Sequence, residues 1–395
     1  MTYFVRAIFL GTSSIAILIK QFLLAQNLSA ELFGIYSTIF LMVALFQQLG
    51  GFGTQVYYSA LLIKLDGEAK HKDKNLLSLA FIPFLFTLPL LYIISHFYFT
   101  SHFLVLTGCA LAFLNCFFVI LTTRYYILDN HKYCKIIALK GVLSLCPMLV
   151  SFVTQNLNII VMLDLLTMTL LVGMYFTKLK LFLVTWKQIK EYLHNLCLRY
   201  SPAIILSALY TYLVKIYVSM SFTNEVIGIF FFIQILIMIA QNIQYILSVL
   251  LGPLIKRYRS RLNRDIGLYV SSYSLCILGI SVIFTLLYFA LSLTLYRLPE
   301  YTEAVPLLLP TIFVSIIRGS DLLSIVNMLM DRPMFVSIQQ GVSVVTLILL
   351  ISYLDVLHLD KIEVVASLLW LEFYSLLIGQ IISFCILIIY LRLKT

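Results

Sequence analysis

The chain has 395 residues, of which 62% are hydrophobic and only 11% are charged, and its mean hydropathy is +1.03. Soluble domains are about 45–50% apolar and about 25% charged, so this composition excludes a water-soluble protein and predicts one that lies in a membrane. Apolar runs of about 20 residues favour spanning helices over the alternating strands of an outer-membrane barrel.

Twelve apolar segments follow one another along the chain, and we predict that each forms a spanning helix. They cover residues 5–26, 33–62, 76–98, 103–123, 136–153, 159–176, 201–220, 226–251, 267–294, 305–330, 334–354 and 362–391. Because the first segment leads directly into further spans, we expect a retained helix and not a cleaved signal peptide.

The basic residues predict the orientation of these helices, since Lys and Arg collect in short cytoplasmic segments. With the N-terminus inside, most of the 27 Lys and Arg residues are cytoplasmic, Lys140 among them, and the outer loops hold only Arg297 and Lys361. We therefore predict a multi-pass protein with both termini in the cytoplasm. The net charge of +10 then reflects this topology and contact with anionic membrane lipids, and nucleic acid is not expected as a partner.

A weak internal repeat divides the chain into halves. A shift of 194 residues places Gly34 over Gly228 and Gln47 over Gln241. Each half begins inside, as in transporters built from parallel repeats. The fold class predicted is an all-α integral membrane protein of 12 transmembrane helices, in two parallel-repeat six-helix bundles around a central cleft.

The longest cytoplasmic connection separates the first six segments from the last six. It sets the predicted domains as an N-terminal six-helix lobe over 1–176, a cytoplasmic linker over 177–200 and a C-terminal six-helix lobe over 201–395.

Two regions resemble a known family. They are LSAELFGIYSTIFLMVALFQQLGGFGTQVYY at 28–58, and YSPAIILSALYTYLVKIYVSMSFTNEVIGIFFFIQ at 200–234 followed by VLLGPLIKRY at 249–258. These stretches resemble the entry helices and the seventh and eighth helices of polysaccharide flippases of the multidrug/oligosaccharidyl-lipid/polysaccharide exporter superfamily. The sequence departs from that family at Ala30, where Pro is common, and at Lys215, where Asp is common.

The resemblance implies a flippase with a fold of the MATE type. Such a protein moves undecaprenyl-diphosphate-linked oligosaccharide repeat units, precursors of lipopolysaccharide O-antigen or capsule, from the cytoplasmic to the outer leaflet of the bacterial inner membrane by alternating access. A polysaccharide polymerase and a chain-length regulator are the protein partners that this function implies.

Among the ionisable residues inside predicted spans, six are candidates for buried charges: Lys20, Asp164, Lys215, Arg318, Asp321 and Glu372. Each charge at a helix centre costs about 2.5–3.5 kcal/mol, so these residues should face a wet cavity or one another. Lys20 and Lys215 are near repeat equivalents on the first helix of each lobe. We expect both to bind the diphosphate or an acidic sugar of the substrate as point charges. The alternative is that they reach out to lipid headgroups.

Three acids are candidates for ion coupling. Asp321 lies one turn after Arg318, which fits either a structural ion pair or a switch in which protonation frees Arg318 for phosphate. Glu372 is expected to be a more isolated proton or cation site, and Asp164 either joins in coupling or faces water. Coupling to a H⁺ or Na⁺ gradient is therefore possible, and no other cofactor is expected.

Glutamines supply a candidate surface for sugar hydroxyls. Gln234, Gln241 and Gln244 recur at helical spacing on the eighth segment, and Gln47 is the counterpart in the first half. Amides offer both donors and acceptors, as hydroxyl groups require, although hydrogen bonds between helices would use the same residues.

Two other function classes compete with the flippase. A multi-span polysaccharide polymerase normally needs a sizeable outer loop for its catalytic residues, and every predicted outer loop here is short, so we do not expect an enzyme. No His has a second ligand at metal spacing, and no Gly-rich phosphate loop predicts ATP binding. A cation-coupled multidrug antiporter of the same superfamily would present acids to cationic drugs, whereas the two lysines favour an anionic substrate.

Overall fold

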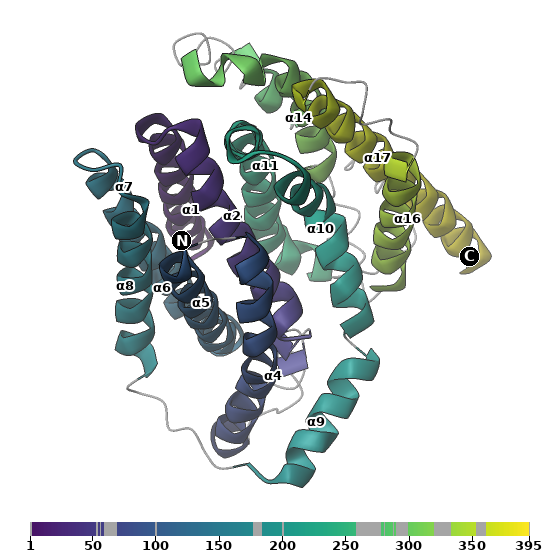
Figure 1. Cartoon of the computed structure of the whole chain (residues 1–395). Coiled ribbons are helices and arrows are strands. Elements are labelled where there is room, and N and C mark those ends of the chain that lie inside the picture. Colours follow the sequence, from purple (N-terminus) through teal and green to yellow (C-terminus); the bar gives the residue numbers. More distant parts are fainter. Residues whose placement is uncertain are drawn as a thin grey trace. The chain divides into compact units, whose positions relative to one another are not determined.

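The computed structural model describes residues 2–52, 54–55, 57–58, 69–98, 101–176, 184–199, 201–257, 278–279, 281–286, 288–289, 299–319, 333–352 and 361–394. Every regular element in these ranges is a helix (Figure 1). This result confirms the all-α fold class. In a bilayer only helices and closed barrels satisfy all of their backbone hydrogen bonds, so an apolar chain with long continuous runs folds in this way.

The chain divides into two compact units. One comprises Met1–Leu28 with Ile35–Ala208, and the other comprises Ser29–Gly34 with Leu209–Thr395. The helices up to the connection are α1 (Thr2–Asn27), α2 (Ala30–Leu45), the π-helix η1 (Phe46–Gly50), α4 (Ala69–Tyr98), α5 (His102–Leu128), α6 (Asn130–Leu143), α7 (Cys146–Ser151), α8 (Leu157–Phe176) and α9 (Trp186–Arg199). The helices after it are α10 (Ser201–Ser221), α11 (Asn224–Arg257), the short 3₁₀ helix η2 (Pro299–Ala304), α14 (Val305–Gly319), α16 (Pro333–Ser352) and α17 (Lys361–Lys394).

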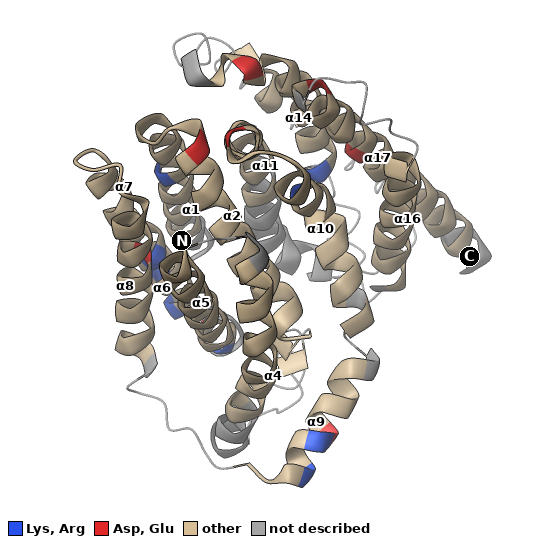
Figure 2. Cartoon of the chain, viewed as in Figure 1, with Lys and Arg blue, Asp and Glu red and all other residues tan. Residues whose placement is uncertain are grey.

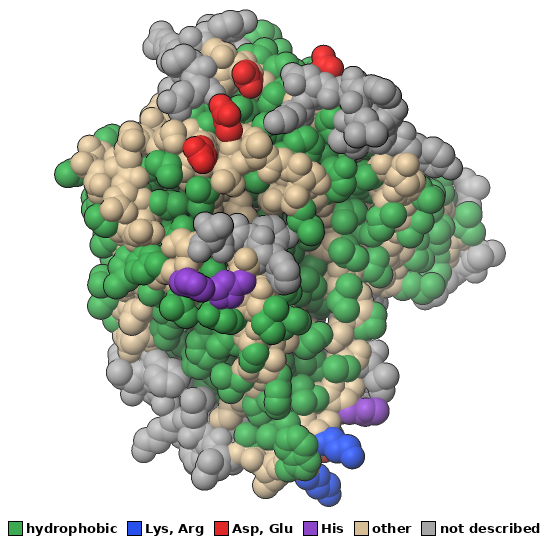
Figure 3. Space-filling model, viewed as in Figure 1, with side chains coloured by type: hydrophobic (Ala, Val, Ile, Leu, Met, Phe, Trp, Pro, Cys, Tyr) green, Lys and Arg blue, Asp and Glu red, His purple; other side chains and the backbone are tan. Residues whose placement is uncertain are grey.

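In the described part of the chain, 10 helical segments are long and apolar enough to cross a membrane. They coincide with ten of the twelve predicted segments. The predicted segment 226–251 corresponds to α11, and most of 267–294 lies outside the described residues. Charged residues are sparse along the described helices (Figure 2), and hydrophobic side chains dominate the face seen in Figure 3. In a protein of this composition, we expect exposed apolar residues such as Phe86 and Leu90 to contact lipid.

The fifth predicted segment does not form a single helix. It is divided into α6 and α7 by a turn at Ser144 and Leu145, and Pro147 lies in the first turn of α7. Proline has no N–H and its ring clashes with the carbonyl four residues earlier, so the first helix ends before it. The two helices together still cover a candidate span, residues 131–151.

A helix also lies inside the stretch predicted only as a linker. In α9, Tyr192 and Leu196 are buried against Leu79 of α4. The Tyr192 hydroxyl forms a 2.6 Å hydrogen bond with Oγ1 of Thr54. Burial raises the pKa of Tyr192 well above its ordinary value, so the phenol remains neutral in this contact. Part of the predicted linker therefore forms a helix that packs against α4 within the first unit.

The repeated glycines meet each other within the second unit. A Cβ at Gly34 would collide with the carbonyl oxygen of Asn224, and a Cβ at Gly228 would collide with the carbonyl oxygen of Ala30. These contacts are reciprocal, because Ala30 and Asn224 are also separated by the repeat interval. Small residues four positions apart allow helix backbones to approach closely in this way. The Gly-Ile-aromatic part of the repeat thus has a packing role.

A second close approach generates a stability prediction. A Cβ at Gly141 of α6 would lie 2.5 Å from the Cα atom of Ser13 in α1. We expect Gly141→Leu to lower the Tm of the purified protein, because a backbone atom cannot move aside and overpacking costs about 1–3 kcal/mol or more. Gly173→Leu is the control, since a Cβ at Gly173 of α8 has open space within 4 Å. Equal Tm values for the two variants in the same detergent would contradict this packing.

Candidate functional site

The first unit contains a buried ion pair that the sequence did not predict. The Lys20 Nζ atom in α1 donates to Oδ1 of Asp164 in α8, and the Tyr36 hydroxyl in α2 donates to Oδ2 of Asp164 over 2.9 Å. Lys20 is 4% exposed and Asp164 is 5% exposed. Lys20 Nζ also lies 4.9 Å from the ring centroid of Phe40. Both carboxylate oxygens are therefore occupied, and the pair joins three helices.

A second lysine lies near this pair. Lys140 Nζ in α6 donates to Oδ1 of Asn115 in α5 over 3.0 Å and lies 4.7 Å from the ring centroid of Phe118. It is close enough to interact electrostatically with Lys20. Lys140 makes no ion pair with any described residue, and its positive charge is balanced only by an amide oxygen and an aromatic face. We call Lys20, Tyr36, Lys140 and Asp164 the first-unit charge cluster.

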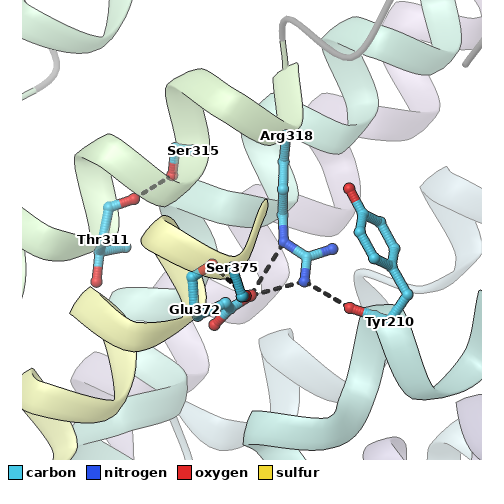
Figure 4. Close-up of polar contacts among 6 residues, drawn as sticks. All are labelled: Tyr210, Thr311, Ser315, Arg318, Glu372 and Ser375. Atoms are coloured by element: carbon cyan, nitrogen blue, oxygen red, sulfur yellow. Dashed lines mark hydrogen bonds and ion pairs between the residues drawn. The ribbon is translucent and has the colours of Figure 1, made fainter. Parts of the chain in front are cut away.

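The second unit contains an equivalent arrangement built from different helices. Arg318 of α14 donates to Oε1 of Glu372 in α17 through Nη2 over 2.6 Å and through Nε over 3.1 Å. Its Nη2 atom also donates to the carbonyl oxygen of Tyr210 in α10 over 3.0 Å. Figure 4 shows the guanidinium group pointing at this carboxylate and this carbonyl. Its carbon atom Cζ lies 5.2 Å from the ring centroid of Tyr210.

Lys215 provides the extra cation of the second unit. It lies one turn after Tyr212 on α10, with Nζ 5.5 Å from the Tyr212 ring centroid, and it interacts electrostatically with both Arg318 and Glu372. Lys215 is half-buried, and it forms no hydrogen bond or ion pair with a described residue. Lys215, Tyr210, Arg318 and Glu372 form what we call the second-unit charge cluster.

The two charge clusters contain the same numbers of cationic and anionic side chains. Each contains two cationic side chains and one carboxylate, and the carboxylate lies on α8 in one unit and on α17 in the other. A buried ion pair is tolerated in an apolar surrounding, but a second cation without a carboxylate needs water, a proton exchange or an anionic ligand. Among the described residues, each cluster therefore has a surplus of positive charge.

The predicted glutamines have different surroundings. Gln234 of α11 is 2% exposed, and neither polar atom of its side chain has a hydrogen-bond partner in the described structure. Gln241, on the same helix, and Gln47, in the π-helix η1, are half-buried. The side chain of Gln244 lies outside what the structure describes. The described contacts thus assign no hydrogen-bonding role to the buried amide of Gln234.

Several expectations about single residues are corrected by these contacts. Glu372 is not isolated, because Arg318 occupies it, and Asp164 does not face water, because it is buried with Lys20. Asp321 lies outside the described residues, so its pair with Arg318 stays a prediction. Lys140, predicted in a cytoplasmic segment, lies within the candidate span 131–151.

The sequence analysis missed Tyr36, Asn115 and Tyr210 as parts of these clusters. Tyr36 and Tyr210 lie in apolar helices where an aromatic residue is expected, and Tyr210 contributes a backbone oxygen, which no side-chain pattern reveals. Lys140 could have been identified from the sequence, since a lysine within an apolar segment needs a partner. No group of three or more His, Cys, Asp or Glu residues that could hold a metal ion occurs among the residues described.

Comparison with known proteins finds similarity in structure only. The sequence matches no protein family and no curated protein. A structure of the lipid II flippase MurJ in an inward closed conformation is similar with a TM-score of 0.69 and 14% identity, over 99% of this chain and 88% of that chain.

Structures of multidrug resistance MATE family transporters of the MOP superfamily are also similar. An inward-facing one has a TM-score of 0.66 at 11% identity, over 97% of this chain and 96% of that chain. An outward-facing one has a TM-score of 0.57 at 13% identity, over 100% of this chain and 96% of that chain. At such low identity these likenesses describe the fold alone. The chain is therefore a multi-pass membrane protein with the fold that these transporters share.

Proposed function

We propose that this protein is a flippase that translocates undecaprenyl-diphosphate-linked oligosaccharide repeat units, precursors of O-antigen or capsule, from the cytoplasmic to the outer leaflet of the bacterial inner membrane by alternating access. The observation that carries this proposal is the surplus of positive charge in both charge clusters. A diphosphate needs cationic partners, and a lysine inside an apolar helix bundle is costly unless an anion or water compensates it. The structural similarity to a lipid II flippase agrees with a lipid-linked substrate.

Lys215 is the residue best suited to contact the diphosphate. Its amine has no carboxylate of its own among the described residues, while Arg318 and Lys20 are each held by an acid. Lys215 and Arg318 both lie close to Glu372, so a phosphate bound to Lys215 would compete with Glu372 for Arg318. Arg318 presents a planar fork that can bind phosphate in a bidentate manner. In this proposal sugar hydroxyls are bound by the glutamines Gln47, Gln234, Gln241 and Gln244. Both polar atoms of the Gln234 side chain lack a hydrogen-bond partner in the described structure.

Ion coupling is proposed to act through the same pair. If Glu372 takes up a proton, its attraction for Arg318 falls and the guanidinium becomes available to the substrate phosphate. Asp164 is a weaker candidate because two donors hold it, and Asp321 is retained as a candidate on sequence grounds alone. In this scheme a proton gradient is the driving force, and a Na⁺ gradient is the alternative.

A cation-coupled multidrug antiporter is the second candidate, and the similarity to MATE transporters favours it. A cationic drug requires an uncompensated acid in the transport path. Both buried carboxylates in the described part of the chain, Asp164 and Glu372, already carry a protein cation, which favours an anionic substrate. A polysaccharide polymerase is less favoured, because the similar structures are transporters and not enzymes.

The first test removes the uncompensated amine. We expect Lys215→Gln to reduce surface-polysaccharide export in a complemented flippase-null strain at least tenfold, because a charge-assisted hydrogen bond to phosphate contributes about 1.5–3 kcal/mol. Lys135→Gln, at an exposed position of α6, is the matched control and should export normally. Both variants must reach the membrane in equal amounts. Normal export by Lys215→Gln would exclude Lys215 from substrate binding.

The second test separates stability from transport at the first-unit ion pair. Lys20→Met leaves Asp164 buried without its cation, so we expect a loss of about 3–5 kcal/mol in stability and a clear fall in Tm. The double variant Lys20→Met with Asp164→Leu should regain most of the lost Tm, since neither charge remains. A double variant that is no more stable than Lys20→Met would show that the two residues do not stabilise the protein as a pair.

The third test concerns coupling. Glu372→Gln resembles the protonated carboxyl group, so we expect transport in proteoliposomes to become insensitive to an imposed pH gradient while substrate binding is retained. The wild-type protein should accelerate several-fold when the gradient is imposed. A Glu372→Gln variant that still responds to the gradient as the wild type does would assign coupling to another residue.

A further inference from the structure

The helix α9 has two distinct faces. Thr185 and Gln188 form a reciprocal cap at its start, with Thr185 N donating to Gln188 Oε1 over 2.9 Å and Gln188 N donating to Thr185 Oγ1 over 3.5 Å. One face of the helix is buried against α4, through Tyr192 and Leu196. The other face is exposed and includes Trp186, Lys187 and Lys190.

The exposed face carries residues typical of a membrane interface. Trp186 is 71% exposed, Lys187 and Lys190 are also exposed, and Lys190 lies one turn after Trp186, on the same side. Glu191 is the only acid within α9. Figure 2 shows basic side-chain positions on α9, with an acidic one beside them. Tryptophan and lysine are enriched at the level of lipid headgroups because each combines an apolar body with a polar end.

The packing of α9 on α4 indicates how far α9 lies from the end of the apolar span of α4. The apolar span of α4 begins at Leu77, and α9 packs on Leu79 and Ile82 of that span. With a rise of about 1.5 Å per residue, these contacts lie within about 8 Å of the end of the span. The headgroup layer occupies about 5–8 Å beyond the hydrocarbon core. Docking on α4 therefore places α9 near one end of this candidate span, where the headgroup layer would begin.

The buried face also links α9 to the chain that follows η1. Tyr192 bonds to Thr54, its ring lies 4.9 Å from the ring of Tyr57, and Ser201, just after α9, donates to the carbonyl oxygen of Phe52 over 3.0 Å. Any ligand that holds the exposed face of α9 thus also restrains the end of the second span.

We propose that the exposed face of α9 is a docking surface for the headgroups of anionic phospholipids, in the leaflet on which α9 lies. Lys187 and Lys190, which follow the exposed Trp186, are electrostatically complementary to phosphate-rich headgroups. Each basic residue near an anionic surface favours binding by about fivefold. Through Tyr192 and Thr54, a bound anionic lipid stabilises the packing of α9 on the first unit. This proposal does not depend on the nature of the transported substrate.

The test uses Trp186 as a reporter. The chain has 2 tryptophans, so Trp370→Phe leaves Trp186 as the only indole, and the aromatic neighbours of Trp370 on α17 and α14 can accept a phenyl ring. This variant is reconstituted into bilayers of phosphatidylcholine and phosphatidylglycerol. Two samples are compared. In one only the phosphatidylglycerol has brominated chains, in the other only the phosphatidylcholine does, and the mole fraction of brominated lipid is the same in both.

We expect brominated phosphatidylglycerol to quench Trp186 more strongly than brominated phosphatidylcholine, corresponding to several-fold enrichment of the anionic lipid. Adding Lys187→Gln and Lys190→Gln should remove this excess, whereas adding Lys135→Gln, remote in sequence from α9, should leave it intact. Equal quenching by the two lipids, or an excess that survives the double lysine substitution, would overturn the proposal. Weak quenching by both lipids would also overturn it, because Trp186 would then lie outside the bilayer.

Discussion

A carboxylate buried among apolar helices must be neutralised, and both units of this protein depend on that requirement. Asp164 holds α1, α2 and α8 together through Lys20 and Tyr36, and Glu372 holds α14 and α17 together through Arg318. Breaking one partner of such a pair costs several kcal/mol because the other charge is left in a low dielectric. The extra cations, Lys140 and Lys215, are the groups that these carboxylates do not compensate, and they motivate the proposal of an anionic substrate.

Much of the fold could be predicted from the sequence, because the signals involved are local. Composition and apolar run length predict an all-α membrane protein, and ten of the predicted segments contain a candidate span. The weak repeat also identified two positions that pack together, since Gly34 and Gly228 make reciprocal backbone contacts. The helix α9 was not predicted, because residues 177–200 were interpreted only as the cytoplasmic connection between the lobes. The periodicity of Ile189, Tyr192 and Leu196 was the available signal.

The contacts of the candidate site could not be predicted in the same way. Lys20 and Asp164 are separated by 144 residues, and Arg318 and Glu372 by 54, so the pairings depend on which helices pack together. The one-turn spacing of Arg318 and Asp321 suggests a local pair, which stays a prediction because Asp321 lies outside the described residues. The Glu372 partner of Arg318 lies on another helix, so no local spacing reveals it. Choosing candidates by the cost of burying a charge identified Lys20, Asp164, Lys215, Arg318 and Glu372 correctly as residues that need explanation. The same criterion did not identify which of these charges are neutralised by an oppositely charged side chain.

The central claim is that the uncompensated cations select an anionic, lipid-linked substrate. The most direct measurement is a competition experiment by native mass spectrometry, in which the purified protein is offered an undecaprenyl-diphosphate-linked oligosaccharide and a lipophilic organic cation at equal concentration. The proposed flippase should retain the lipid-linked oligosaccharide and lose most of it when Lys215 is replaced by Gln. Preferential retention of the cation, with no effect of Lys215→Gln, would contradict the claim and favour the multidrug antiporter.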